Sequence, residues 1–405
     1  GNVKVTTNET NSDKDAHATI DGGSSAGLKI EKGSEVQGDL TLRSGHANTI
    51  TDEGGSGVVT VDGNLTATTY ANNGSITLND LAVDGTIGLN THGTGDATVV
   101  NDAGFQFAAS SVGGNLHATA TTGNMTQSGA LDIEGTTTLI TVANNASITL
   151  GTASNAFTGA LIITTNDNDA APNDTNGDVT IHGGTTALVL GNSTIDGDLT
   201  LTSTATGTAG ITDTGTLNIR GTTTISASGV DVTLNSAANN FQGSIAINGS
   251  DVILVNAYAT TDLGASTVTG TYTLTASGGV IDSGALAITG VTTVSAGGDV
   301  TLNTVTNNFQ GAVKIAANNV EVVDAGAIDL GASTVTGTYR VTATAGGDIT
   351  NSGVLTISGG AIFKAASGQS IYLNESNIFS STVAFTTPSG NLANVTVRDT
   401  TDFDL

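Results

Sequence analysis

Apolar and polar residues alternate in short runs along most of the chain. Between Gly284 and Gly353 the alternation marks segments at 285–289, 292–296, 299–303, 311–317, 320–325, 327–333, 338–345 and 347–350. A period of two residues predicts β-strands, because successive side chains of a strand point to opposite faces. Gly, Asn, Asp and Ser separate these runs and predict tight turns. The sequence therefore predicts an all-β chain without helical segments.

Long internal repeats accompany this pattern. The phrase DLGASTVTGTY occurs at 262–272 and at 329–339, and DVTLNSAANNFQG at 231–243 returns as DVTLNTVTNNFQG at 299–311. The offsets are 67 and 68 residues. A shorter signature, written VQGDLTL from Val36 and VTGTYRVT from Val335, runs through most of the chain. Such repeats predict one repetitive structure in place of the two or three domains that length alone suggests.

Two all-β architectures compete for these strands, a row of sandwich domains and a parallel β-helix. Sandwich domains need about 100 residues and aromatic-bearing strands, whereas aromatic residues make up 3% of this chain. Three coils of about 22–23 residues would fit one repeat. The sequence thus predicts a right-handed parallel β-helix of roughly 18 coils, in which Gly and Asn adopt the positive φ angles of the corners.

The repeat also suggests how the chain is organised. We expect a degenerate N-terminal segment at 1–34, β-helix repeats at 35–380 with three coils each, and final coils of the same solenoid at 381–405. An acidic loop insertion is predicted at 164–178, because the repeat is locally longer there and the stretch is very polar. The chain begins at Gly1 without a signal peptide, and we interpret it as a piece of a longer protein.

Charge and cysteine content exclude several classes of protein. The chain has 36 acidic and 10 basic residues, for a net charge of −26. A polyanion repels nucleic acid and anionic membranes, so neither is an expected partner. No apolar run approaches the roughly 18 residues of a membrane-spanning helix. The absence of Cys excludes disulfides, zinc–thiolate sites and cysteine nucleophiles.

Hard oxygen ligands gather in the 164–178 insertion. They are Asp167, Asp169, Asp174, Asn176 and Asp178. Carboxylate and amide oxygens suit Ca²⁺, so calcium is the one candidate cofactor. The spacing does not match an EF-hand, and the alternative is a solvated loop of turn-forming residues.

Paired carboxylates such as Asp196 and Asp198 raise the question of catalysis. Glycoside hydrolases use two carboxyl groups. Here the pairs fall in the turn signature, where Asn often replaces Asp. A role in turns explains that interchange and catalysis does not, so we predict no catalytic residue and no enzyme. Threonine pairs on outward strand positions, such as Thr200 and Thr202, are interpreted as ordinary strand surface.

Several repeated phrases resemble the filamentous-haemagglutinin-like exoproteins of Gram-negative bacteria. The resemblance rests on SVGGNLHATATTGNMTQSGALDIEG at 111–135, TLNSAANNFQGSIAINGSDVILVNA at 233–257 and DLGASTVTGTYTLTASGGVIDSGALAITGVTTVSA at 262–296. It covers roughly 35–380 and implies a secreted β-helix, exported by two-partner secretion, that serves as an adhesin, biofilm matrix component or toxin stalk. The family's N-terminal secretion domain and a toxin-like C-terminal domain are not visible, and no functional residue carries over.

The sequence as a whole predicts a non-enzymatic stalk or adhesive segment of a large secreted bacterial surface protein. The expected partners are host-cell or matrix glycans and proteins, or copies of the chain itself. One alternative is an extracellular filament protomer that stacks end to end. A β-helix carbohydrate-active enzyme is the less favoured alternative.

Overall fold

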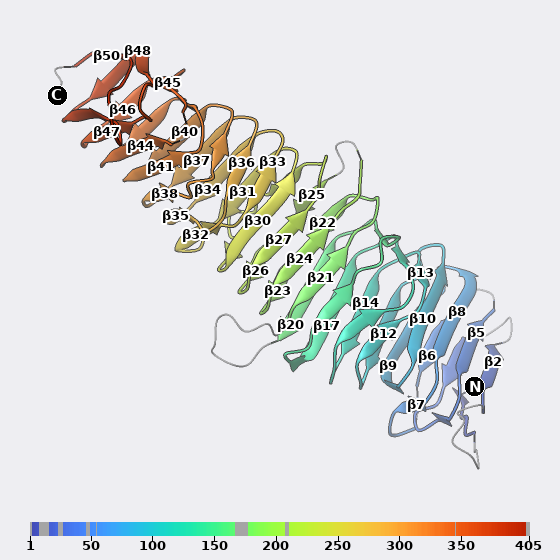
Figure 1. The fold of residues 1–405 in the computed structure, drawn as a ribbon. Helices are drawn as coiled ribbons and strands as arrows, with labels where there is room; N and C mark the ends of the chain where they lie inside the picture. The colour runs from blue at the N-terminus through green and yellow to red at the C-terminus, as the bar shows by residue number, and fades with distance from the viewer. Residues whose placement is uncertain are drawn as a thin grey trace. The chain divides into compact units, whose positions relative to one another are not determined.

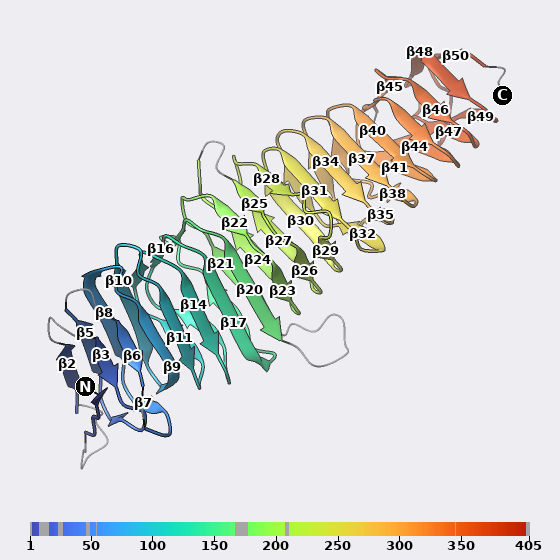
Figure 2. The same cartoon turned by 180° about the vertical axis from the view of Figure 1, so that it is seen from behind.

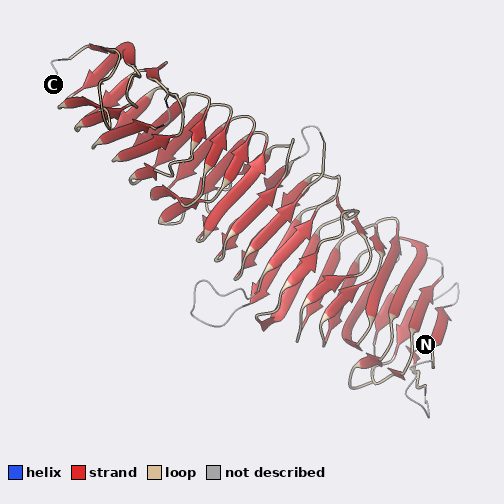
Figure 3. Cartoon of the chain, viewed as in Figure 1, coloured by secondary structure: helices blue, strands red, loops and turns tan. Residues whose placement is uncertain are grey.

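The fold was taken from a computed structural model of the 405-residue chain. It describes residues 2–7, 16–22, 27–45, 49–53, 55–166, 177–206, 210–344 and 346–401. All regular elements in these ranges are β-strands (Figure 3). None of the described residues forms a helix that could cross a membrane. The chain divides into two compact units, one of residues 1–215 and 219–221, the other of 216–218 and 222–405.

The first unit contains two parallel sheets. Its first sheet holds β1 (Asn2–Val3), β3 (Leu28–Ile30), β4 (Glu35–Val36), β6 (Ile50–Asp52), β7 (Val59–Val61), β9 (Ile76–Val83), β11 (Ala97–Asn101), β14 (Leu116–Ala120), β17 (Thr137–Asn144), β20 (Leu161–Asn166), β22 (Leu188–Leu190), β23 (Ser193–Ile195) and β25 (Ile211–Asp213). Its second sheet holds β2 (Ala18–Gly22), β5 (Leu40–Ser44), β8 (Leu65–Asn72), β10 (Thr86–His92), β12 (Phe105–Phe107), β13 (Ser110–Val112), β15 (Met125–Gln127), β16 (Leu131–Ile133), β18 (Ile148–Leu150), β19 (Ala156–Phe157), β21 (Val179–His182) and β24 (Leu199–Thr202).

The second unit is built in the same way, and β26 (Leu217–Ile219) is shared between the two. Its first sheet holds β28 (Val232–Leu234), β29 (Asn240–Phe241), β31 (Val252–Asn256), β34 (Tyr272–Ala276), β37 (Thr292–Ala296), β40 (Val313–Ala317), β42 (Ile328–Leu330), β43 (Ser333–Val335), β45 (Ile349–Asn351), β46 (Leu355–Ile357), β48 (Ile371–Phe379) and β50 (Val395–Asp399). Its second sheet holds β27 (Thr223–Ser226), β30 (Ser244–Gly249), β32 (Thr260–Leu263), β33 (Ser266–Val268), β35 (Gly279–Asp282), β36 (Leu286–Ile288), β38 (Val300–Leu302), β39 (Asn308–Phe309), β41 (Val320–Asp324), β44 (Tyr339–Ala343), β47 (Ala361–Lys364) and β49 (Val383–Thr386).

The chain is a parallel β-solenoid of about 17 turns, which confirms the predicted fold class. Strands pair in parallel with strands of the turns before and after them, as Tyr272 does with Val252 and Thr292. Figures 1 and 2 show this stacking from opposite sides. Inward residues alternate with outward ones, so Leu274 is fully buried between half-exposed and exposed threonines. Apolar side chains of both sheets therefore fill the interior of each unit.

The number of turns in one repeat differs from the prediction. The DLGASTVTGTY phrase begins on β32 and β33 of the second sheet, and its next copy on β42 and β43 of the first. Seven passages between the sheets separate the copies, by way of β34, β35 with β36, β37, β38 with β39, β40 and β41. The expected three coils of about 22–23 residues are wrong: a repeat makes three and a half turns of about 19 residues. Equivalent residues of successive repeats thus lie on opposite sheets.

Glycines of the repeated signature allow successive turns to stack closely, because a side chain at these positions would contact the backbone of the preceding turn. A Cβ on Gly85 would lie 2.4 Å from the carbonyl oxygen of Gly63 in the preceding turn, and Gly85 does not have a positive φ. The expectation that glycine corners need positive φ is wrong at this position. Asn73 and Asn145 do adopt positive φ, of 66° and 65°, as expected for asparagine in turns.

Once in each repeat a strand faces two shorter strands with a break between them. In the second unit β30 pairs with β32 at Ser244 and Ile245 and with β33 at Asn248 and Gly249. The amide of Ile247 lies opposite the break and donates to Oγ of buried Ser266, at 3.0 Å. This Oγ donates in turn to the carbonyl of Gly264. The same bond recurs from Leu89 to Ser110, Ile163 to Ser193 and Ile315 to Ser333.

Candidate functional site

The predicted calcium ligands fall mostly outside the described residues. Asp167, Asp169, Asp174 and Asn176 all lie there, so the calcium site stays a prediction. Asp178 is described, and its Oδ1 accepts the backbone N–H of Asp198 at 2.8 Å. Within the described ranges, no group of three or more His, Cys, Asp or Glu side chains could hold a metal ion.

Asp and Asn side chains of the signature link one turn to the next at the corners. Asp39 Oδ1 accepts the backbone N–H of Asn64, and Asn64 Oδ1 accepts that of Thr86. Thr86 ends the string, because its hydroxyl donates back to the same Oδ1 of Asn64. Similar strings run Asp96–Asn115–Thr136, Asp178–Asp198, Asp231–Asp251–Thr271 and Asp299–Asn319–Thr338.

These strings explain why Asp and Asn interchange in the signature. A carboxylate and a carboxamide oxygen both accept a backbone N–H, so either residue satisfies the next turn. At Asp299 the effect on ionisation is direct. The backbone N–H of Asn319, together with the side-chain amides of Asn318 and Asn319, lowers the pKa of Asp299 below its ordinary value.

Asp196 and Asp198 have different partners in the structure. Asp198 belongs to the corner string with Asp178. Asp196 faces Arg220, with 3.5 Å between its Oδ1 and the guanidinium. Basic residues near the start of the chain are paired in a similar way, Lys29 with Glu53 and Lys32 with Asp80. The bond to Asp80 raises the pKa of Lys32.

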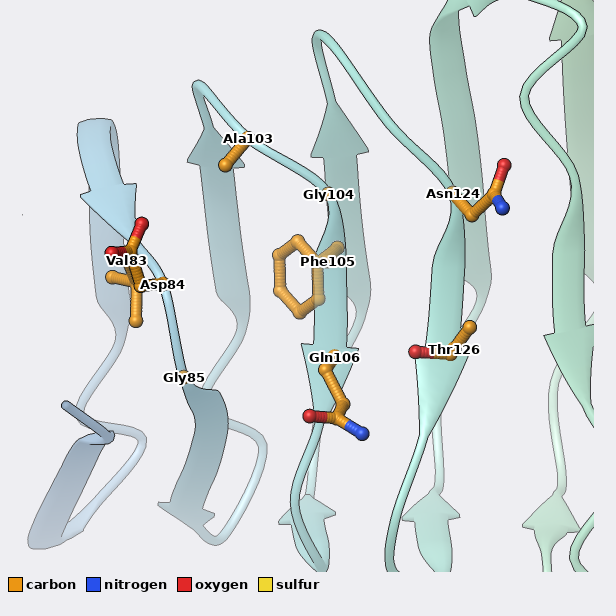
Figure 4. Close-up of a pocket in the computed structure, with 9 residues that line it drawn as sticks. All are labelled: Val83, Asp84, Gly85, Ala103, Gly104, Phe105, Gln106, Asn124 and Thr126. Carbon is orange, nitrogen blue, oxygen red and sulfur yellow. The ribbon is translucent and has the colours of Figure 1, made fainter. Parts of the chain in front are cut away.

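A surface groove of the first unit encloses about 420 Å³. Its lining comes from the corner after β9, the turn before β12, and β15, and includes Asp84, Gly85, Phe105, Gln106, Asn124 and Thr126. Figure 4 shows Gln106 and Thr126 on adjacent strands, with the Asn124 amide turned away from them. Asn124 Oδ1 accepts the backbone N–H of Ser147 in the next turn. Exposed Asp84 adds a carboxylate to the groove, and Gln106 and Thr126 supply uncharged outward polar groups.

A rank of uncharged polar side chains continues from this groove along the second sheet. Gln106, Thr126, Thr149, Thr180 and Thr200 stand in register on five successive turns; we call them the open rank. Each is exposed or half-buried. None of them makes a side-chain hydrogen bond to another described residue, in contrast to the corner strings. Sequence reasoning missed the open rank, because only the strand register shows which threonines are neighbours.

Comparison with known families assigns the chain to a family of repeats. A family model for repeats of unknown function, DUF5649, matches residues 94–164, 176–248, 249–316 and 317–386. These matches cover more than half of the chain, so the chain belongs to the DUF5649 repeat family. Comparisons with curated proteins and with solved structures gave no match.

Proposed function

We propose that the chain is a non-enzymatic adhesive stalk segment of a large secreted bacterial surface protein, and that it binds uncharged glycans along the open rank. The observation that carries this proposal is the register, over successive turns, of five polar side chains that make no side-chain hydrogen bond within the described part of the chain. The resemblance to filamentous-haemagglutinin-like exoproteins supports secretion by the two-partner route. End-to-end assembly stays the alternative prediction.

The chemistry of the open rank favours a polyhydroxylated chain without charge. Hydroxyls and a carboxamide both donate and accept hydrogen bonds, as sugar hydroxyls do. Neighbouring parallel strands lie about 4.8 Å apart, so these groups recur at an interval similar to one sugar unit of an extended polysaccharide. Acidic polysaccharides are disfavoured, because the chain carries a net charge of −26.

Co-sedimentation with insoluble polysaccharides tests the proposal. The full chain is incubated with cellulose and chitin as uncharged polymers and with covalently cross-linked pectate beads, free of calcium, as an acidic one. We expect binding to an uncharged polymer, and a tenfold or greater loss when Thr149→Lys and Thr180→Lys are combined. Two bulky charged side chains would then interrupt the open rank.

Matched control positions lie on the first sheet of the same unit. Thr98 and Thr138 face outward there, two turns apart with His117 in register between them. Thr98→Lys with Thr138→Lys changes the charge equally and should leave binding intact. Circular dichroism checks that both double variants fold. Equal binding by the two double variants, or no binding to either uncharged polymer, would refute the proposed site.

A further inference from the structure

In the second unit, two pairs of successive family repeats are joined by a buried side chain that hydrogen-bonds to the backbone of the preceding repeat. The earlier pair is 176–248 with 249–316, and the later pair is 249–316 with 317–386. In the earlier pair Asn256, at the end of β31, reaches Phe241 of β29. In the later pair Asp324, at the end of β41, reaches Phe309 of β39. Both offsets are 68 residues (324 − 256 and 309 − 241). Asn256 and Asp324 are both fully buried, so the fold places an amide and a carboxyl group in the same interior position.

The amide in the earlier pair both accepts and donates. Asn256 Oδ1 accepts the backbone N–H of Phe241 at 3.0 Å, and Asn256 Nδ2 donates to the Phe241 carbonyl at 3.0 Å. Nδ2 also donates to the hydroxyl of Thr261. A backbone strand edge is thus satisfied at both its donor and its acceptor. Asn101 binds the backbone of Val83 with the same pair of bonds.

The carboxyl group in the later pair accepts at both oxygens. Asp324 Oδ2 accepts the backbone N–H of Phe309 at 2.7 Å, and Oδ1 accepts that of Gly326 at 2.6 Å. An ionised carboxylate has no donor for the Phe309 carbonyl, whereas a protonated one has. Only the neutral acid can therefore reproduce both bonds that Asn256 makes.

No ion pair of the described residues includes Asp324. Tyr339 of β44 faces inward. Asp282 of β35 accepts a hydrogen bond from the side-chain amide of Asn307. The backbone carbonyl of Asn307 accepts the N–H of Ala325, the residue after Asp324. Glu321 and Arg340 lie at outward positions and face each other, at 4.0 Å. Burial raises the pKa of Asp324 against the opposing effect of the Phe309 and Gly326 amides.

We propose that Asp324 is a protonation-dependent latch between the family repeats at 249–316 and 317–386. The neutral carboxyl donates a hydrogen bond to the Phe309 carbonyl and closes the latch; the ionised carboxylate leaves that carbonyl without a donor. The ordinary pKa of Asp is 3.8 and the folded-state pKa is higher. The stabilisation is therefore fully present below pH 3.8 and is lost as the pH rises through the folded-state pKa.

Hydrogen exchange read by mass spectrometry on the full chain tests the latch. Residues 303–330 contain it, and residues 235–262 contain the Asn256 counterpart as an internal control. Between pH 4 and 9, after correction for intrinsic exchange, we expect the opening of 303–330 to rise about fivefold, as for the loss of one hydrogen bond. Opening of 235–262 should stay constant.

Two swaps make the test specific. Asp324→Asn should abolish the pH dependence at 303–330, and Asn256→Asp should create one at 235–262. Identical pH dependence of the two segments in the wild type, or persistence of the dependence in Asp324→Asn, overturns the latch. If Asn256→Asp does not fold, the wild type and Asp324→Asn still decide the question.

Discussion

The serine at each strand break gives a sharp test of how the turns are held together. Ser333 is 3% exposed, and its Oγ accepts the backbone N–H of Ile315 at 3.0 Å while donating to the Gly331 carbonyl. Ser333→Ala removes the acceptor and leaves a buried N–H unpaired. An unsatisfied buried donor costs about 1–3 kcal/mol. We therefore expect the local opening equilibrium around β40 to rise by about 5-fold to 160-fold.

Hydrogen exchange of peptides covering 311–317 measures this change. The matched control is Thr334→Ala, because Thr334 is the next residue along β43 and is exposed. Exchange at 244–249 reports on the equivalent Ser266 bond and should not change in Ser333→Ala. If Ser333→Ala and Thr334→Ala exchange equally at 311–317, the strand break does not depend on the serine.

Two further predictions concern buried and corner side chains. Thr292 Oγ1 is buried without a hydrogen-bond partner among the described residues, and the next repeat has Ala361 at this position. Thr292→Val should raise the free energy of unfolding by about 1 kcal/mol, and a lower melting temperature would contradict this. The lowered pKa of Asp299 predicts that protection of the Asn319 amide, present above pH 3.8, is lost as the pH falls through the folded-state pKa. Asp299→Asn should remove that acid dependence, and its persistence would assign it to another group.

Much of the fold follows from local sequence pattern. The eight segments expected between Gly284 and Gly353 correspond to β36, β37, β38, β40, β41, β42, β44 and β45. Alternating Val, Ile and Leu with polar residues leaves little choice of secondary structure. The strand β39 was missed, because two residues cannot show a period, and only the first residue of β43 falls within an expected segment, 327–333. The turn role of Asp198 was also predictable, since Asn replaces Asp in the signature.

The number of turns in a repeat and the functional surface were harder to predict. A repeat of 67 or 68 residues can form three turns of about 22–23 residues or three and a half turns of about 19 residues. The sequence does not decide between them, because loops can absorb the difference in length. The register is settled by which buried side chains stack. The acceptor role of Ser333 could not be predicted from the sequence, because it depends on Ile315 of another turn. The open rank likewise depends on register across five turns.

The central claim is that one repeat makes three and a half turns, and paired cysteines test it most directly. The chain has no native Cys. Thr273 and Thr293 face outward, in register on β34 and β37, where the spacing of parallel strands suits a disulfide. We predict that Thr273→Cys with Thr293→Cys forms an intramolecular disulfide under mild oxidation. Thr273→Cys with Ser295→Cys, the pair that coils of about 22 residues would bring into register, should not cross-link, because Ser295 pairs with Thr275. Cross-linking of the second pair and not the first would contradict the account.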